Sequence, residues 1–234
     1  MVMISGFILT VLVYAVTKRM YRTLHFVLFS PILTSLLLLV FILASFHLSY
    51  RTYNQSASWL TDLLKPATVA FAIPLYKHFH ILRKHAAEIV SGIAAGVVTA
   101  ISSSVLLATS MHLQASVVNS LAPRSITTPI AMDVAREVGG VPVMTAVFVI
   151  LTALIGLLAA PVVIRLLHIR SPLAQGTLYG TGAHGIGTSR AFEIGGLEGT
   201  ISSLSMILAA LFTLVLAPLG VPLLHQWLEF HIRM

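Results

Sequence analysis

Cysteine is absent from this sequence, and charged residues are scarce. The first absence excludes disulfides, thiolate nucleophiles and cysteine-bound metal ions. The charged fraction is 9%, whereas soluble domains have roughly 25%. With 57% hydrophobic residues and a mean hydropathy of +0.96, the chain is predicted to be an all-α polytopic membrane protein.

Acidic residues are rarer than basic ones. The 234 residues include 7 Asp and Glu but 14 Lys and Arg, which gives a net charge of +7. The basic residues form short clusters between apolar runs, and no nucleic-acid-binding motif accompanies them. The positive-inside rule and anionic lipid headgroups explain this excess. The first apolar run lacks a preceding charge and is followed by Lys18 and Arg19, which predicts a first span with its N-terminus outside the cytoplasm rather than a cleavable signal.

Hydropathy predicts six full spans and two irregular, re-entrant or broken helical segments. The spans are 3–17, 27–46, 60–76, 89–108, 141–164 and 200–224, and the irregular segments are 115–140 and 172–198. A polar loop is expected at 47–59 and a basic loop at 77–88. The third span is itself irregular, because Pro66 and Pro74 interrupt it.

Two topologies fit this pattern. If the irregular segments dip in and return, the chain has six spans; if they cross, it has eight, and Arg165 and Arg170 move outside. The positive-inside rule favours re-entrance, and both topologies put both termini outside the cytoplasm. The expected organisation is a single transmembrane domain over 1–234, with N-terminal spans at 1–59, a core at 60–224 and a tail at 225–234.

The segment 123–140 is unusually polar for its surroundings. Ser125 is a plausible N-cap residue, Pro129 lies within one turn of a helix start, and the pair Gly139-Gly140 is predicted to stop the helix. Such a helix is typical of a cavity lining inside a membrane protein, because lipid does not tolerate exposed polar backbone.

Two other segments resemble this one. Lys65-Pro-Ala-Thr68 aligns with Arg124-Ser-Ile-Thr127, and a third irregular segment around His184 and Thr188 follows at a similar distance. This spacing predicts a weak internal repeat, and broken helices at corresponding positions of repeats point to a transporter binding site. The glycines of 180–188, including Gly182, Gly185 and Gly187, lack the lysine of a P-loop and are expected to allow close backbone approach.

Each candidate residue has a functional and a structural interpretation. In the functional interpretation, an anion site is formed by Arg124, helix N-terminal amides and neighbouring hydroxyls. In the structural interpretation, the arginine reaches the lipid headgroups and the threonines bond their own backbone. The functional role of His184 would be to donate a hydrogen bond to a carboxylate substrate or to carry a proton that is coupled to transport. The structural alternative is a histidine bonded to a carbonyl. Asp133, Arg136 and Glu137 are expected to form a structural ion pair.

No catalytic Ser-His-acid set and no metal-ligand spacing is visible, so an enzyme, a cofactor and a metal site are not expected. Small residues along 89–108, including Gly92 and Gly96, suit close helix packing either within the chain or in a homo-oligomer.

Three motifs occur in order: 66–76, Ser125-Ile-Thr-Thr-Pro-Ile-Ala-Met132 and Gly180-Thr-Gly-Ala-His-Gly-Ile-Gly-Thr188. Together they resemble the LrgB/CidB family, over 3 to about 224. That family includes the bacterial inner-membrane protein YohK and the LrgB-like half of the plastidic glycolate/glycerate translocator. The base before Ser-x-Thr-Thr-Pro, typically lysine in the family, is Arg124 here.

The resemblance implies two alternative functions. The first is a carrier of small monocarboxylates such as pyruvate, glycolate and glycerate. The second is a holin-like or antiholin-like modulator of murein hydrolase export and cell lysis, which acts with a small LrgA/CidA-type partner. A third alternative is a scaffold without a ligand of its own. The carrier is the preferred hypothesis, acting by alternating access in a bacterial inner membrane. Its predicted substrate site comprises Thr68, Arg124, Ser125, Thr127, Thr128, His184 and Thr188, supported by the helix breaks at Pro66, Pro129, Gly182, Gly185 and Gly187.

Overall fold

The computed structural model describes residues 2–24, 30–63, 66, 69–70 and 72–232. These residues form helices joined by turns, with no strand among them, which confirms the predicted all-α class. By its internal contacts the chain divides into two compact units, Met1–Ala72 and Ile73–Met234. The candidate site lies in the second unit.

The first unit contains α1 (Val2–Leu24), α2 (Pro31–Ser45) and α3 (Tyr50–Asp62). The prediction of a polar loop at 47–59 is wrong, because α3 covers most of it. Ser56 and Ala57 are buried, and Ser56 Oγ accepts a 3.0 Å hydrogen bond from the Gly6 amide of α1. Buried positions on a single face, beside exposed polar residues, make an amphipathic helix despite the low hydrophobicity.

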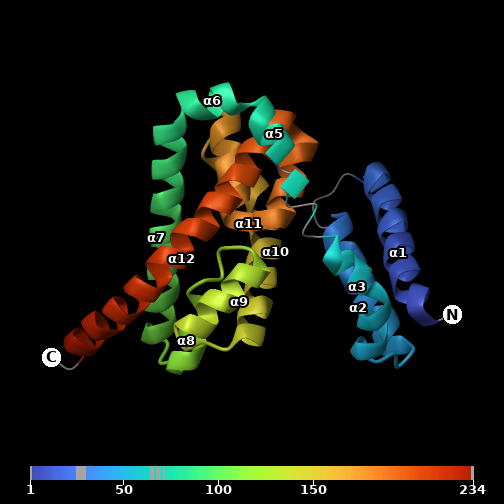
Figure 1. The fold of residues 1–234 in the computed structure, drawn as a ribbon, viewed down its shortest axis with the longest axis horizontal. Coiled ribbons are helices and arrows are strands. Elements are labelled where there is room, and N and C mark those ends of the chain that lie inside the picture. The colour runs from blue at the N-terminus through green and yellow to red at the C-terminus, as the bar shows by residue number, and fades with distance from the viewer. Residues whose placement is uncertain (1, 25–29, 64–65, 67–68, 71, 233–234) are drawn as a thin grey trace. The chain divides into compact units, whose positions relative to one another are not determined.

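The second unit continues the chain through short and long helices (Figure 1). They are α5 (Ala72–Lys77), α6 (Phe79–Lys84), α7 (Ala86–Ser110), α8 (Ala115–Leu121), α9 (Thr128–Glu137), α10 (Pro142–Leu166), α11 (Pro172–Ile194) and α12 (Gly196–Ile232). Helix α12 packs along α11 and α7, and α10 packs against α9 and α11. Figure 1 shows α5 and α6 near one end of α7, and α8 at the other.

Three helices in the described part of the chain are long and apolar enough to cross a membrane: α7, α10 and α12 over Gly196–Trp227. They confirm the predicted spans 89–108, 141–164 and 200–224, and α12 continues through most of the predicted tail. Their outward side chains are apolar, with Leu107 65% and Ile155 64% exposed, as expected for residues that face lipid. Helix α2 is a shorter apolar helix, and the total of six spans stays a prediction.

The predicted basic loop at 77–88 is instead helical, with interruptions at His78 and His85. Lys77 lies in the last turn of α5, and Arg83 and Lys84 lie in the last turn of α6. Cations there interact favourably with the partial negative charge at the carboxyl end of a helix. The basic residues therefore support two short helices, where the sequence pattern suggested irregular chain.

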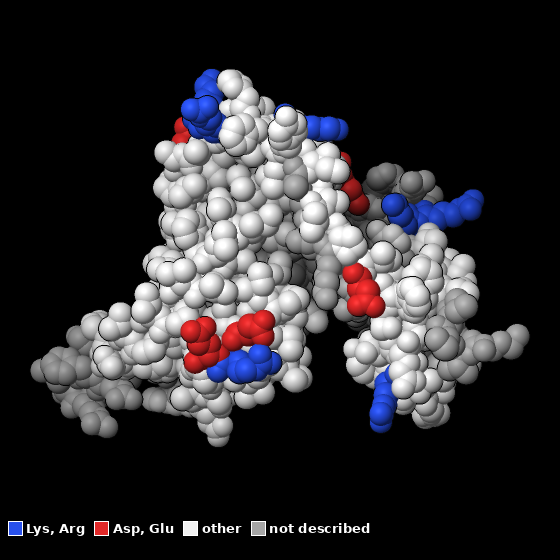
Figure 2. Space-filling model, viewed as in Figure 1, with Lys and Arg blue, Asp and Glu red and all other residues white. Residues whose placement is uncertain are grey.

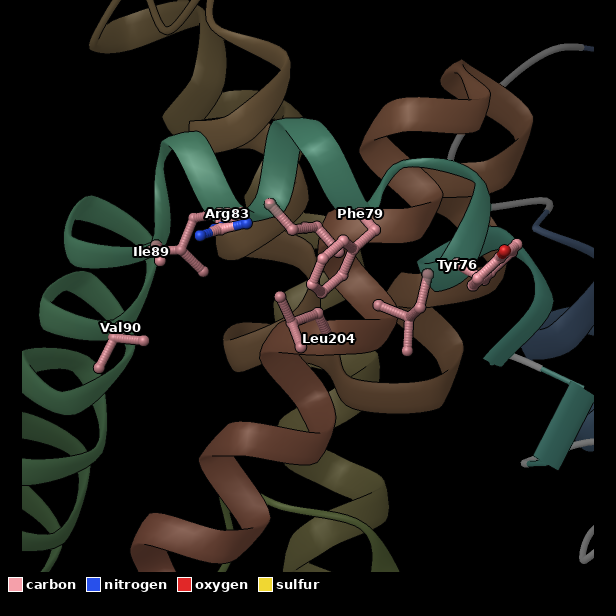
Figure 3. A pocket seen from close by; sticks show the side chains of 9 residues that line it. Tyr76, Phe79, Arg83, Ile89, Val90 and Leu204 are labelled. Carbon is pink, nitrogen blue, oxygen red and sulfur yellow. The ribbon is translucent and has the colours of Figure 1, made fainter.

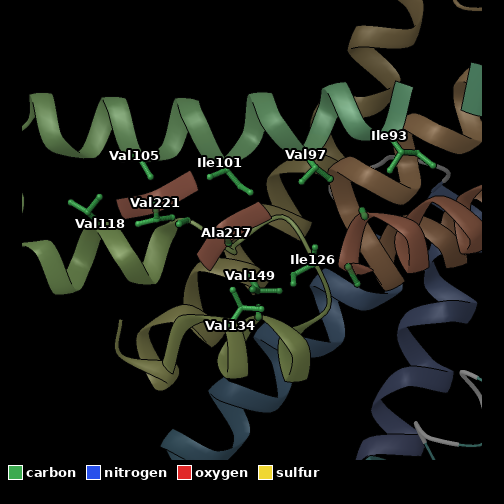
Figure 4. Packing of buried hydrophobic residues seen from close by; sticks show 14 of the residues in the cluster. Ile93, Val97, Ile101, Val105, Val118, Ile126, Val134, Val149, Ala217 and Val221 are labelled. Atoms are coloured by element: carbon green, nitrogen blue, oxygen red, sulfur yellow. The ribbon is translucent and has the colours of Figure 1, made fainter. Parts of the chain in front are cut away.

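The hydrophobic core of the second unit follows one stripe of α7 (Figure 4). Ile93, Val97, Ile101 and Val105 are each 4% exposed or less, and their spacing of four residues puts them on one helix face. They pack against residues of α8, α9, α10 and α12, such as Val118, Val134, Val149 and Val221. Ile126, from the connection between α8 and α9, is fully buried in this cluster and so fixes the connection inside the bundle.

Charged residues lie toward the two ends of the second unit on the face shown in Figure 2, and the surface between them is uncharged. At one end, acidic and basic side chains gather over α9, where Arg136 bonds Asp133 at 2.8 Å. At the other end, basic residues lie over α5 and α6. An uncharged band between charged ends fits helices that cross a bilayer.

Candidate functional site

The segment 115–140 forms a helical hairpin with α8 and α9 as its arms. The connection 122–127 extends from the end of the bundle toward its middle (Figure 1). The N-cap residue of α9 is Thr127, so the prediction that Ser125 caps this helix is wrong. The helix begins immediately before Pro129, whose fixed φ suits a first turn, and Ser125 is left in the connection beside Arg124.

Two glycines end α9, as predicted. Gly139 has φ of +81°, which L side chains rarely adopt. Its amide donates to the Arg136 carbonyl at 3.4 Å, and the Gly140 amide donates to the Ala135 carbonyl at 2.7 Å. This pair of bonds is the Schellman motif, which satisfies the last carbonyls of a helix and turns the chain away.

The end of the hairpin is fastened to its beginning. The Val141 amide donates to Ser120 Oγ of α8 at 2.7 Å, and Asn119 Nδ2 donates to the Val138 carbonyl at 2.7 Å. Asn119 Oδ1 also pairs with His225 Nε2 of α12 at 3.0 Å. The chain therefore leaves this hairpin close to where it entered it.

Arg124 extends from the connection between the long helices. Its Nε donates to Ser104 Oγ of α7 at 2.9 Å, and its Nη1 donates to Thr152 Oγ1 of α10 at 3.4 Å. Thr152 lies near the middle of α10. Both acceptors are neutral hydroxyls, which orient the guanidinium without neutralising it.

Helix α11 is broken at His184, which has φ 48° and ψ −129° inside an otherwise helical run. A straight helix rises about 1.5 Å per residue, so residues eight apart would stand about 12 Å apart along it. A Cβ on Gly187 would nevertheless stand 3.0 Å from the Tyr179 carbonyl carbon and 2.8 Å from Ala183 Cβ. The second half of α11 therefore turns back against the first, confirming the predicted irregularity of 172–198.

The end of α11 also returns toward its start. Gly176, in the first part of α11, is packed against the beginning of α12, where a Cβ would stand 2.7 Å from the Glu198 carbonyl oxygen and 2.7 Å from Ile201 Cβ. Helix α12 begins immediately after α11 ends. Like the α8–α9 hairpin, α11 thus brings the chain back near its point of entry.

The break carries a buried, incompletely bonded imidazole. His184 is 3% exposed, and within the described residues its Nε2 has no hydrogen-bond partner. The ring lies close enough to Arg124 to interact with its main chain and with its charge. Thr188 Oγ1 donates to the His184 carbonyl at 2.9 Å and bonds Ser202 Oγ at 3.0 Å, so Thr188 holds the backbone of the break.

A cavity of about 430 Å³ lies beside Arg124 and the first half of α11. It is lined by Ala95, Gly96, Val97, Thr99, Ala100, Arg124, Ser125, Thr152, Thr181, Gly182 and Ala209. Gly96 and Gly182 would meet nothing within 4 Å if they carried a Cβ, because they face open space. Gly92 is equally open, so the alternative of close internal packing through Gly92 and Gly96 is not seen. The cavity combines one cation with hydroxyls in an apolar bundle.

Some of the predicted site residues line or adjoin the cavity, others lie in α9 and the second half of α11, and the remaining two lie before the second unit. Arg124, Ser125 and Gly182 line the cavity, and His184 interacts with Arg124. Thr127 and Thr128 begin α9, whereas Thr188, Gly187 and Gly185 belong to the second half of α11. Thr68 lies outside the described residues, and Pro66 is exposed in the first unit.

Sequence reasoning missed four hydroxyl residues. Thr152 and Ser104 orient Arg124, while Thr99 and Thr181 line the cavity. Thr99, Ser104 and Thr152 lie in runs that read as regular helix, where a hydroxyl commonly bonds its own backbone. Thr181 lies in the glycine motif 180–188, where the glycines and His184 drew the attention. A hydroxyl in the middle of a long apolar span is the signal that could have found Thr152.

The charged residues of α9 lie apart from this cavity. Asp133 and Arg136 form an exposed ion pair at 2.8 Å, and Glu137 is exposed as well. None of the three lines the cavity. No group of three or more His, Asp or Glu side chains comes together anywhere in the described ranges.

The model of the LrgB-like family matches residues 10–223, across both units. The chain belongs to the LrgB-like family. This confirms the resemblance on the motifs around Ser125 and His184.

Relatives within the family cover nearly the whole chain. The uncharacterized protein YwbG of Bacillus subtilis (strain 168) is 51% identical over 92% of this chain and 96% of its own length. The uncharacterized protein YxaC of the same strain is 38% identical over 93% of this chain and 95% of its own length. The antiholin-like protein LrgB of Bacillus mycoides (strain KBAB4) is 28% identical over 93% of this chain and 95% of its own length. No solved structure matches this LrgB-like chain.

Proposed function

We propose that this LrgB-like protein is a secondary carrier for small monocarboxylates of the pyruvate, glycolate and glycerate type. The observation that carries the proposal is the guanidinium of Arg124 at the cavity, which two hydroxyls hold and which forms no ion pair with an acid among the described residues. A cation in an apolar bundle is costly unless an anion accompanies it. A carboxylate would supply that anion, and the hydroxyls of Ser125, Thr152 and Thr181 would bond a second oxygen function.

The size of the cavity supports a small substrate. At about 430 Å³ it lies near the lower end of the range for ligand pockets, roughly 300–1,000 Å³. The lining residues come from the middle of α7 and α10, which corresponds to the middle of a bilayer if these helices span it. Secondary carriers commonly bind substrate at that depth, between broken helices.

The two broken segments support alternating access. Since each returns toward its point of entry, we infer that 115–140 and 172–198 are re-entrant, which leaves Arg165 and Arg170 on the same side as the basic residues of α5 and α6. The positive-inside rule makes that side cytoplasmic and puts both termini outside, in a bacterial inner membrane. The connection around Arg124 and the break at His184 would then enclose the substrate from opposite sides, and His184 would carry a co-transported proton or donate to the carboxylate.

An antiholin-like role is the second candidate, because a relative of this chain is named antiholin-like protein LrgB. Such a role would involve a small LrgA/CidA-type membrane partner, and homo-oligomerisation would suit it. A membrane-lesion protein needs apolar spans and self-association, but it has no need of an arginine held at a cavity by two hydroxyls. The geometry therefore favours the carrier, and a changed flux of metabolites would account for effects on lysis.

Uptake into proteoliposomes tests the proposal. Vesicles containing the purified full chain should accumulate labelled pyruvate or glycolate above empty vesicles. Arg124→Ala and His184→Ala should abolish uptake while the protein keeps its elution profile and helical circular dichroism. Arg136→Ala is the matched control, since Arg136 lies on the same segment but bonds Asp133 at the surface. Uptake that never exceeds empty vesicles, even with an LrgA-type partner present, would refute the carrier.

A further inference from the structure

A second cavity, of about 450 Å³, lies under the short helices α5 and α6 and shares no lining residue with the first. Its walls include Tyr76, Phe79, Ala86, Val90 and Leu204. Figure 3 shows the Phe79 ring pointing toward Leu204 of α12, with Val90 of α7 on the opposite wall. These groups are apolar over almost their whole surface, so the cavity suits a hydrocarbon chain.

One cation joins this apolar lining. Arg83 is exposed and lines the cavity, and its guanidinium lies at the upper edge beneath α6 in Figure 3. In the described part of the chain it forms no ion pair with an acid. Glu88, the acid in the first turn of α7, bonds His85 Nδ1 at 3.0 Å instead. The arginine is therefore available to an anion from outside the chain.

The surroundings are those of a membrane surface. Helix α7, long and apolar enough to cross a bilayer, begins at Ala86 and lines this cavity with its first turns. Tyr76 is 85% exposed, and tyrosine side chains concentrate at the headgroup level, while the neighbouring apolar ring of Phe79 is 60% exposed. Exposed Lys77 and Lys84 flank Arg83, and basic groups there attract anionic lipids.

We propose that this cavity is a binding site for an anionic phospholipid. The phosphate pairs with Arg83 at the rim, and one acyl chain lies along Phe79, Val90 and Leu204. An apolar wall joined to a single unneutralised cation matches a molecule with a long hydrocarbon chain and a phosphodiester charge, and it excludes a free phosphate ion, which would gain nothing from the wall. The proposal does not depend on what the Arg124 cavity carries.

Native mass spectrometry of the full chain tests the site, with dioleoyl phosphatidylglycerol and dioleoyl phosphatidylcholine as the probes. Phosphatidylglycerol should be retained preferentially. Arg83→Gln should weaken its retention by about tenfold, the effect of one lost hydrogen bond to a charged group. Lys84→Gln is the matched charge control and should weaken retention much less, since Lys84 does not line the cavity.

A second pair of variants tests the acyl position. Ala86→Phe fills the cavity and should remove preferential retention, whereas Ala87→Phe, on the same turn but not in the lining, should leave it unchanged. Thermal unfolding of each variant without lipid shows that the fold is kept. Equal effects of Arg83→Gln and Lys84→Gln would mean diffuse surface attraction and would overturn the proposal. Equal retention of the two lipids, or no difference between Ala86→Phe and Ala87→Phe, would also overturn it.

Discussion

The contact between α10 and the break in α11 gives a prediction that can be worked out in numbers. A Cβ on Gly156 of α10 would stand 2.8 Å from the Gly182 carbonyl carbon and 3.1 Å from Ala183 Cβ, and it would also press on the Gly182 carbonyl oxygen. Gly156→Ala therefore overpacks a backbone contact, at a cost of about 1–3 kcal/mol. At about 3 °C per kcal/mol for a domain of this size, the unfolding temperature should fall by roughly 3–9 °C.

Gly182 is the matched control, because it belongs to the same contact but faces the cavity. Its Cβ would meet nothing within 4 Å, and alanine is favoured over glycine in a helix by about 0.5–1 kcal/mol. Gly182→Ala should therefore leave the unfolding temperature unchanged or slightly raised, and Gly182→Leu should block uptake while the fold is kept. The measurement is fluorescence-detected thermal unfolding of purified variants. If the two alanine variants unfolded at the same temperature, the close contact of Gly156 in α10 with the backbone before the break in α11 would be contradicted.

Three further predictions concern single contacts. Arg124→Lys keeps the charge but loses the planar fork, so substrate affinity should fall by about 10–100-fold with little change in thermal stability; unchanged affinity would contradict the role of the guanidinium. Asn119→Ala breaks bonds to α9 and α12 and should cost about 1–3 kcal/mol, while exposed Gln114→Ala should cost little, both measured by thermal unfolding. Thr188→Val removes the bonds to the His184 carbonyl and to Ser202 Oγ, whereas Ser202→Ala removes only the shared one, so a double-mutant cycle should be non-additive, and strict additivity would rule out their coupling.

The regular spans and the helix stops could be predicted from the sequence. Long apolar runs fixed the positions of α7, α10 and α12, because burial in lipid leaves few alternatives to a helix. The glycine pair after Val138 and the glycine-rich run around His184 marked the end of α9 and the break in α11, since both need backbone conformations that side chains oppose. Arg124 was recognisable as a cation between apolar spans.

Helices made of polar residues and contacts between distant segments could not be predicted in this way. Helix α3 reads as a loop because its buried residues, such as Ser56 and Ala57, are small and weakly hydrophobic. The hydroxyl of Thr152 looks like an ordinary residue of a span until the fold brings Arg124 to it. The N-cap residue is Thr127 and not the predicted Ser125, because Pro129 determines where the helix begins.

Solute counterflow tests the central claim most directly, because it separates a carrier with a binding site from a membrane lesion. Proteoliposomes holding the purified chain are loaded with unlabelled pyruvate or glycolate and diluted into a trace of the labelled acid. A carrier predicts that the label rises transiently above its equilibrium level, and that Arg124→Gln loses this overshoot while Arg136→Gln keeps it. Label that only approaches equilibrium from below, equally in all three proteins, would contradict a substrate site at Arg124.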